Sequence, residues 1–127
     1  MIQAKLIGDA ARNIVLNVRG VVDADIGLTP IFDISELKAS TKYTRDYIKV
    51  ASAWWLIQEK MTLLLSWSEN PEDLLFPMES RNAISFNRFV DPPDPKNWKG
   101  KIFMRSVNQA SCLGGSGHFA FCLDFDR

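Results

Sequence analysis

The carboxyl-terminal segment carries a strict alternation of apolar and other side chains. Phe119, Phe121, Leu123 and Phe125 occupy every second position, with small or polar residues between them. A period of two places these four side chains on one face of a β-strand, and that face has to be covered by another apolar layer. The feature predicts a strand near the carboxyl end with a second layer packed against it.

The same alternation occurs in residues 14–18 and 84–90, and residues 101–107 form a further apolar segment after a turn at Gly100. Segment 101–107 leads into the glycine-rich stretch Gly114–Gly117. We therefore expect this segment to pair antiparallel with the terminal strand, as a hairpin closed by a long loop.

Residues 51–65 fit two interpretations. Apolar side chains at helical spacing, with Gln58, Glu59 and Lys60 between them, are typical of an amphipathic helix. Alternation on both sides of the same three polar residues predicts instead a hairpin with a polar tip. Periodicity cannot separate the two in so apolar a run, and we favour the hairpin.

A short helical start is visible at Asn70, where an asparagine cap is followed by Pro71 and two acidic residues. Pro77 limits this element to about one turn. We predict an all-β antiparallel sandwich, Ig-like or jelly-roll-like, with at most one short helical turn near residues 71–76. A length of 127 residues fits a single domain over 1–127, with residues 1–12 as an N-terminal arm or an edge strand.

The composition excludes several classes of protein. Fifteen basic and fifteen acidic residues leave no formal net charge, which argues against a protein held mainly on nucleic acid or anionic lipid. An apolar fraction of 46% excludes wholesale disorder. Two cysteines cannot form a disulfide scaffold, and we see no secretory signal or membrane-spanning segment. We expect synthesis in the cytosol.

The single histidine, His118, restricts catalysis and metal binding. The segment Gly114–His118 lacks the final glycine of a nucleophile elbow and the lysine of a phosphate-binding loop. Cys112, His118 and Cys122 supply three ligands where a structural zinc site requires four. We therefore expect no enzyme, and no catalytic, cofactor-binding or metal-binding residues.

The adjacent pair Trp54 and Trp55 is the best sequence indication of self-association. Alternation buries one of the two on a given face, so the other lies in a second core layer or in an interface. Aromatic and methionine side chains are enriched at the centres of interfaces. The candidate interface residues are Trp54, Trp55, Phe76, Met78, Trp98 and Lys99.

A basic segment lies between Ser80 and Val107, where six basic and two acidic residues give a net charge of +4. Such polarity suits docking to an acidic surface or head-to-tail association. Trp98 between Lys96 and Lys99 is also typical of grooves that bind single-stranded nucleic acid. The alternative is a solvated loop in which Trp98 caps the core.

Five motifs in residues 30–127 occur in an order that is similar to that of a known protein family. The motifs are Ile31–Leu37, Leu63–Trp67, Asn82–Phe86, Trp98–Ile102 and Gly117–Phe125. In this order they resemble small β-sandwich virion proteins of tailed bacteriophages, which are capsid decoration or cement proteins, with similar folds at the neck.

The resemblance implies a non-enzymatic virion protein, made in the host cytoplasm, that self-associates as a homo-oligomer and stabilises the capsid. Its expected partners are its own copies and the major capsid protein or a neighbouring virion protein, not nucleic acid or a membrane. Two alternatives stay open. One is a carbohydrate-binding module that uses Trp54 or Trp55 and Trp98, and the other is a single-stranded nucleic-acid binder that uses the basic segment.

Overall fold

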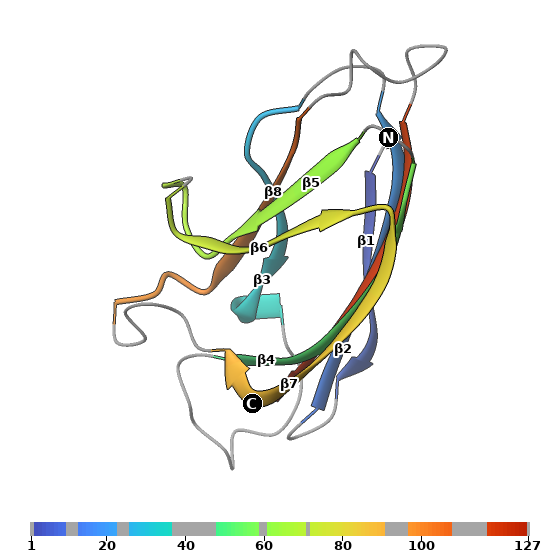
Figure 1. Ribbon diagram of the computed structural model, residues 1–127. Coiled ribbons are helices and arrows are strands. Elements are labelled where there is room, and N and C mark those ends of the chain that lie inside the picture. The colour runs from blue at the N-terminus through green and yellow to red at the C-terminus, as the bar shows by residue number, and fades with distance from the viewer. Residues whose placement is uncertain are drawn as a thin grey trace.

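The structure describes residues 2–9, 13–22, 26–36, 48–58, 61–70, 72–90, 97–107 and 117–126 of the chain. Within these ranges the computed structural model contains nine strands and one short 3₁₀ helix (Figure 1). The elements are β1 (Ile2–Asp9), β2 (Asn13–Val22), β3 (Thr29–Asp33), η1 (Ile34–Glu36), β4 (Lys49–Ile57), β5 (Thr62–Ser66), β6 (Leu74–Glu79), β7 (Arg81–Val90), β8 (Lys101–Val107) and β9 (Gly117–Asp126).

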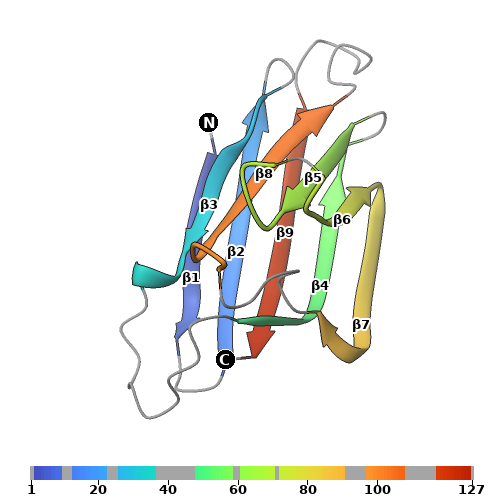
Figure 2. The same cartoon turned by 90° about the vertical axis from the view of Figure 1, so that its left-hand side faces the viewer.

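The strands form two antiparallel sheets that face each other, which confirms the predicted sandwich. One sheet has the order β1-β2-β9-β4-β7, and the other has the order β3-β8-β5-β6. Figure 2 shows the four-stranded sheet lying across the front of the five-stranded sheet.

The pairing of the strands is nested. β5 pairs with β6, β4 with β7, β3 with β8 and β2 with β9, so the chain resembles one long hairpin rolled over itself. Two sheets built in this way are a jelly roll, which is one of the two expected sandwich types. β1 is added at the edge of the five-stranded sheet, beside β2.

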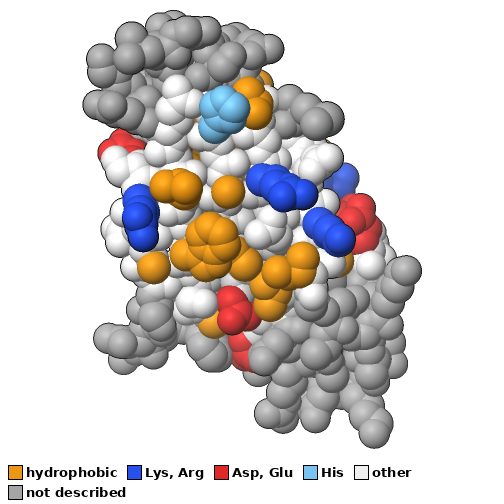
Figure 3. Space-filling model, turned by 90° about the vertical axis from the view of Figure 1, so that its right-hand side faces the viewer, with side chains coloured by type: hydrophobic (Ala, Val, Ile, Leu, Met, Phe, Trp, Pro, Cys, Tyr) orange, Lys and Arg blue, Asp and Glu red, His pale blue; other side chains and the backbone are white. Residues whose placement is uncertain are grey.

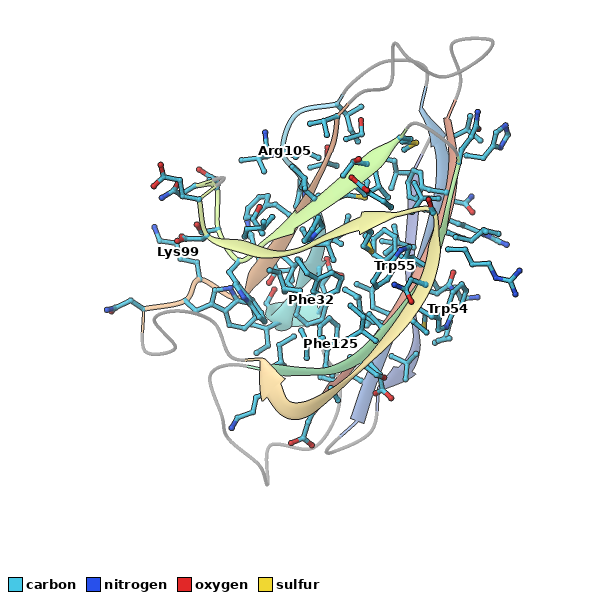
Figure 4. The ribbon with its side chains drawn as sticks, viewed as in Figure 1. Phe32, Trp54, Trp55, Lys99, Arg105 and Phe125 are labelled. Carbon is cyan, nitrogen blue, oxygen red and sulfur yellow. The ribbon has the colours of Figure 1, made fainter. Side chains whose placement is uncertain are left out.

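The core lies between the sheets and follows the alternation in the sequence. Phe121, Leu123 and Phe125 of β9 are fully buried. Phe32 reaches them from the four-stranded sheet, with its ring centroid 5.3 Å from that of Phe125 (Figure 4). Such contacts between the inward faces of the two sheets cover the apolar side of β9, as its alternation predicted.

Both predicted hairpins were wrong, although each of their strands exists. β4 and β5 replace the helix considered for residues 51–65, but they belong to different sheets. β8 and β9 are likewise in different sheets and do not pair. The reason is that consecutive strands of a jelly roll cross from one sheet to the other, while alternation identifies only the face that is buried.

The corner between β6 and β7 is one of these crossings. Ser80 has a φ of 58°, a left-handed conformation that turns the chain sharply. The backbone N–H of Ile57 donates to the Ser80 carbonyl at 2.6 Å, and Nε1 of Trp55 donates to the Glu79 carbonyl at 2.9 Å. These bonds attach the corner to β4 and fix the direction of the Trp55 side chain.

The turn at Asn70 is shorter than the predicted range 71–76. The Asn70 side chain accepts a hydrogen bond from the backbone N–H of Glu72 at 3.1 Å, and its carbonyl accepts one from Asp73 at 3.0 Å. The asparagine therefore caps a hydrogen-bonded turn, but residues 72–76 contain no helical turn, because β6 already begins at Leu74. The helical turn found among the described residues is η1 instead.

β1 forms an edge strand in the structure, which is one of the two arrangements considered for residues 1–12. Leu6 packs against the core, whereas Ile7 lies at a break in the β1–β2 register and is 58% exposed. Among the described residues, no helix has the length and apolar character that crossing a bilayer requires.

Candidate functional site

The outer face of the five-stranded sheet points away from the four-stranded sheet, and no further layer covers it within the described part of the chain (Figure 3). Its side chains alternate with those of the core. They are Gln3, Lys5 and Ile7 of β1, Val15, Asn17, Arg19 and Val21 of β2, His118, Ala120, Cys122 and Asp124 of β9, Ser52, Trp54 and Leu56 of β4, and Arg81 and Ala83 of β7. We call this set the outer face.

The middle of the outer face is apolar. Trp54 and Leu56 of β4 are 46% and 56% exposed there, and Ile7, which is 58% exposed, lies on the edge strand β1. Figure 3 shows hydrophobic side chains gathered here, with basic side chains beside them. An antiparallel sheet that faces water on one side normally presents polar residues there. Large exposed apolar patches are found at contact surfaces of proteins, which makes this face the candidate site.

The strand register sets which of these side chains are neighbours. Cys122 lies opposite Asn17 on one side and opposite Trp54 on the other, and Trp54 in turn lies opposite Ala83. Lys5 continues the same row on β1, beside Asn17. This central row crosses the whole sheet, and Trp54 is its largest side chain.

Cys122 is a free thiol in the central row. Partial burial and the nearby Asp124 carboxylate raise the pKa of the thiol, while a hydrogen bond with the Trp54 side chain acts in the opposite direction. The thiol form is therefore favoured at neutral pH, which makes Cys122 a weak nucleophile.

Charges are segregated on the two sides of the central row. Arg19 and Arg81 lie in the row towards one end of the strands, in register with Ala120 and Leu56. Asp124 lies in the row towards the other end, opposite Val15 and Ser52. Beyond Asp124, the next row holds Asp126 opposite Lys49, so two arginines lie towards one end of the outer face and two aspartates with one lysine lie towards the other.

The structure separates the sequence-predicted candidates into core and surface. Trp55 is 4% exposed and its ring stacks on Phe76 at 5.8 Å, while Met78 is fully buried. Trp54 lies on the opposite side of β4 (Figure 4). The alternation rule for the tryptophan pair is therefore confirmed, whereas Phe76 and Met78 belong to the core and are absent from the exposed surface.

Trp98 and Lys99 lie elsewhere, beside the four-stranded sheet. The Trp98 ring meets Trp67 edge-on at 5.5 Å, and its Nε1 donates to the carbonyls of Trp67 at 2.9 Å and Lys101 at 3.0 Å. Trp98 thus packs at the margin of the core, as the solvated-loop alternative expected. Lys99 is exposed.

A cavity of about 480 Å³ opens beside Trp98. Its lining combines aromatic side chains with amides and charges of both signs, namely Trp67, Ser68, Glu69, Asn70, Asp73, Asn97, Trp98, Lys99, Lys101 and Phe103.

The basic segment is not one patch. Arg81 is in register with Leu56 of the five-stranded sheet, whereas Arg105 is in register with Leu64 of the four-stranded sheet. Lys96 lies outside the described residues. The charge excess of this segment is therefore divided between two sheets.

Sequence reasoning missed Leu56 and Arg19 as surface residues of interest. Leu56 lies between the inward-facing Trp55 and Ile57, and Arg19 follows the inward-facing Val18. The same alternation that identified the core could have assigned both to the outer face. What it could not show is that β2, β9 and β4 lie side by side.

In the residues that the structure describes, no three His, Cys, Asp or Glu side chains gather to hold a metal ion. Cys112 and Gly114–Ser116, which entered the sequence arguments about zinc and nucleophiles, lie outside those residues. Comparison of the chain with protein-family models, with curated proteins and with solved structures gives no match.

Proposed function

We propose that this protein is a non-enzymatic structural component of a bacteriophage virion, a decoration or cement protein that self-associates and stabilises the capsid. The observation that carries the proposal is the apolar centre of the outer face, where Trp54 and Leu56 are about half exposed. An interface of this composition suits permanent assembly with a protein partner.

The fold-level analogy points the same way. Jelly rolls recur in viral capsid proteins and in lectins, although a fold alone does not fix a function. Three of the motifs that carry the resemblance to phage virion proteins correspond to β5, to the start of β7 and to β9. These strands build both sheets of the sandwich.

The physical role of such a protein is to add contacts that span neighbouring capsid subunits. Opening the shell then requires breaking these contacts as well as those between the subunits. The burial of apolar surface contributes about 25 cal/mol per Å², and rim charges select the partner and the register.

A capsid-binding experiment tests the proposal. The purified protein is added to capsids that lack it, and genome release is followed during heating. We expect binding at a fixed stoichiometry and a higher release temperature, with both effects lost in Trp54→Glu. Leu74→Glu is the matched control, because Leu74 is similarly exposed, at 43%, but lies on β6. Absence of binding by the unmodified protein would refute the proposal.

A second candidate function is carbohydrate binding, which the cavity beside Trp98 favours. Its volume of about 480 Å³ lies in the range of small-molecule sites, and its lining joins an aromatic side chain to several polar groups. Glycan-array binding that is lost in Lys99→Ala and Glu69→Gln, but retained in Trp54→Glu, would support this candidate over the first.

A further inference from the structure

We infer that the outer face is covered by the outer face of a second copy of this chain. A two-fold axis relates the two copies. It lies between their outer faces and runs across the strands. This inference deepens the proposed function, because it names the partner of the outer face.

The area is sufficient for a specific contact. Five strands about 4.8 Å apart, each presenting about seven residues that rise about 3.4 Å, cover roughly 24 Å by 24 Å. If the two faces cover each other completely, they remove about 1,100 Å² from water, which is slightly more than the roughly 1,000 Å² that a biological interface needs. We expect a dimer that forms at micromolar concentration and is reinforced where many copies are held close together.

The charges select the direction of the axis. If the axis ran along the strands, the central strand β9 would lie over its own copy, with Asp124 facing Asp124 of the second copy. Two carboxylates facing each other in an apolar contact repel. An axis across the strands avoids this contact.

With the axis across the strands and along the central row, each half of the face lies over the opposite half of the second copy. Arg19 then lies over the position of Val15 in the second copy, one strand away from its Asp124. Sheets that pack face to face are about 10 Å apart, which an arginine and an aspartate can span. The two-fold axis makes this ion pair twice.

The central row lies on the axis, so Trp54 packs against Trp54 of the second copy. Ala83 and Cys122 beside it are small enough to let the two sheets approach. Lys5 lies over Lys5 of the second copy, but this contact is at the β1 edge of the sheet, where solvent screens the repulsion between the two charges. The arrangement places Trp54 on the axis, the Arg19–Asp124 pairs on either side of it and Lys5 at the edge of the contact.

Sedimentation velocity over a micromolar concentration series tests the pairing with the full chain. We expect a monomer–dimer equilibrium, weakened at least a hundredfold in Trp54→Glu and in Leu56→Glu. Leu74→Glu serves as the control and dimerises as the unmodified chain does. A chain that stays monomeric, an assembly of three or another odd number of copies, or an equilibrium unchanged in both outer-face variants would overturn the inference.

Charge reversal tests the direction of the axis. Arg19→Glu and Asp124→Arg should each weaken the dimer about tenfold, because each places two like charges together. An equimolar mixture of the two variants should restore the affinity as a heterodimer, since one ion pair then forms with reversed sign and the other is the original Arg19–Asp124 pair. A mixture that associates no better than either variant alone would overturn the predicted axis.

Thiol labelling gives an independent measurement in a Cys112→Ser background. Cys122 lies in the central row, so its rate of reaction with a maleimide should fall as the protein concentration rises, and should not fall in Trp54→Glu. Capsid binding is measured separately. Capsid binding by a protein that stays monomeric would overturn the pairing and leave the proposed stabilisation of the capsid standing, and a dimer that does not bind capsids would do the reverse.

Discussion

At the scale of single residues, the neighbours Trp54 and Trp55 have opposite roles. Trp55 is 4% exposed, stacks on Phe76 and donates to the Glu79 carbonyl, while Trp54 is 46% exposed on the other side of the strand. The same amino acid is therefore part of the core at one position and part of the surface at the next.

We predict that Trp55→Ala lowers the free energy of unfolding by about 3–5 kcal/mol, because it removes a buried aromatic ring and leaves a cavity. Trp54→Ala should lower it by less than about 1 kcal/mol, because this ring is half exposed. Urea denaturation of dilute protein measures both values. Equal losses in the two variants would contradict the assignment of Trp55 to the core and Trp54 to the surface.

At the scale of elements, the turn before β8 is fixed by one glycine. Gly100 has a φ of 82°, and a Cβ atom there would collide with the Ile34 side chain of η1. The carbonyl of Gly100 also accepts a hydrogen bond from the backbone N–H of Ile34 at 2.7 Å. The close approach of the two segments therefore depends on the missing side chain.

We predict that Gly100→Ala lowers the free energy of unfolding by about 2 kcal/mol or more, from the positive φ together with the collision. Gly27→Ala is the matched control, because no atom lies within 4 Å of a Cβ at that position. It should change the value by less than about 0.5 kcal/mol. Thermal melts followed by circular dichroism compare the two variants with the unmodified chain.

The strands could be predicted from the sequence much better than their partners. In β2 and β9, alternation alone identified the buried face, because one side of each strand is almost wholly apolar. The crossings from β4 to β5 and from β8 to β9 could not be identified, because a change of sheet leaves the alternation unaltered. The exposure of Trp54 could be inferred from the adjacent Trp55. The residues that share the outer face could be identified only from the order of the five strands in the sheet.

At the scale of the whole molecule, the nested pairing predicts that different strand pairs form at different times during folding. β5 and β6 are joined by the shortest loop of the nest, while β2 and β9 are about a hundred residues apart. Closing the small loop costs less entropy, so we expect the β5–β6 pair to form early and the β2–β9 pair to form late.

Leu65 and Leu123 test this order, since both are fully buried. Leu65→Ala in β5 should mainly slow folding, whereas Leu123→Ala in β9 should mainly accelerate unfolding, with losses of about 2–5 kcal/mol in each variant. Stopped-flow folding in urea separates the two rates. A reversal of the two effects would show that the outermost pair forms first.

The position of β9 also matters during synthesis of the protein. β2 and β4 flank a space in the middle of their sheet that only Gly117–Asp126 fills, and these residues are translated after every other described strand. A nascent chain therefore holds two incomplete strand edges until this segment has left the ribosome exit tunnel. During that interval the polypeptide is exposed to chaperones and to premature contact with other nascent chains.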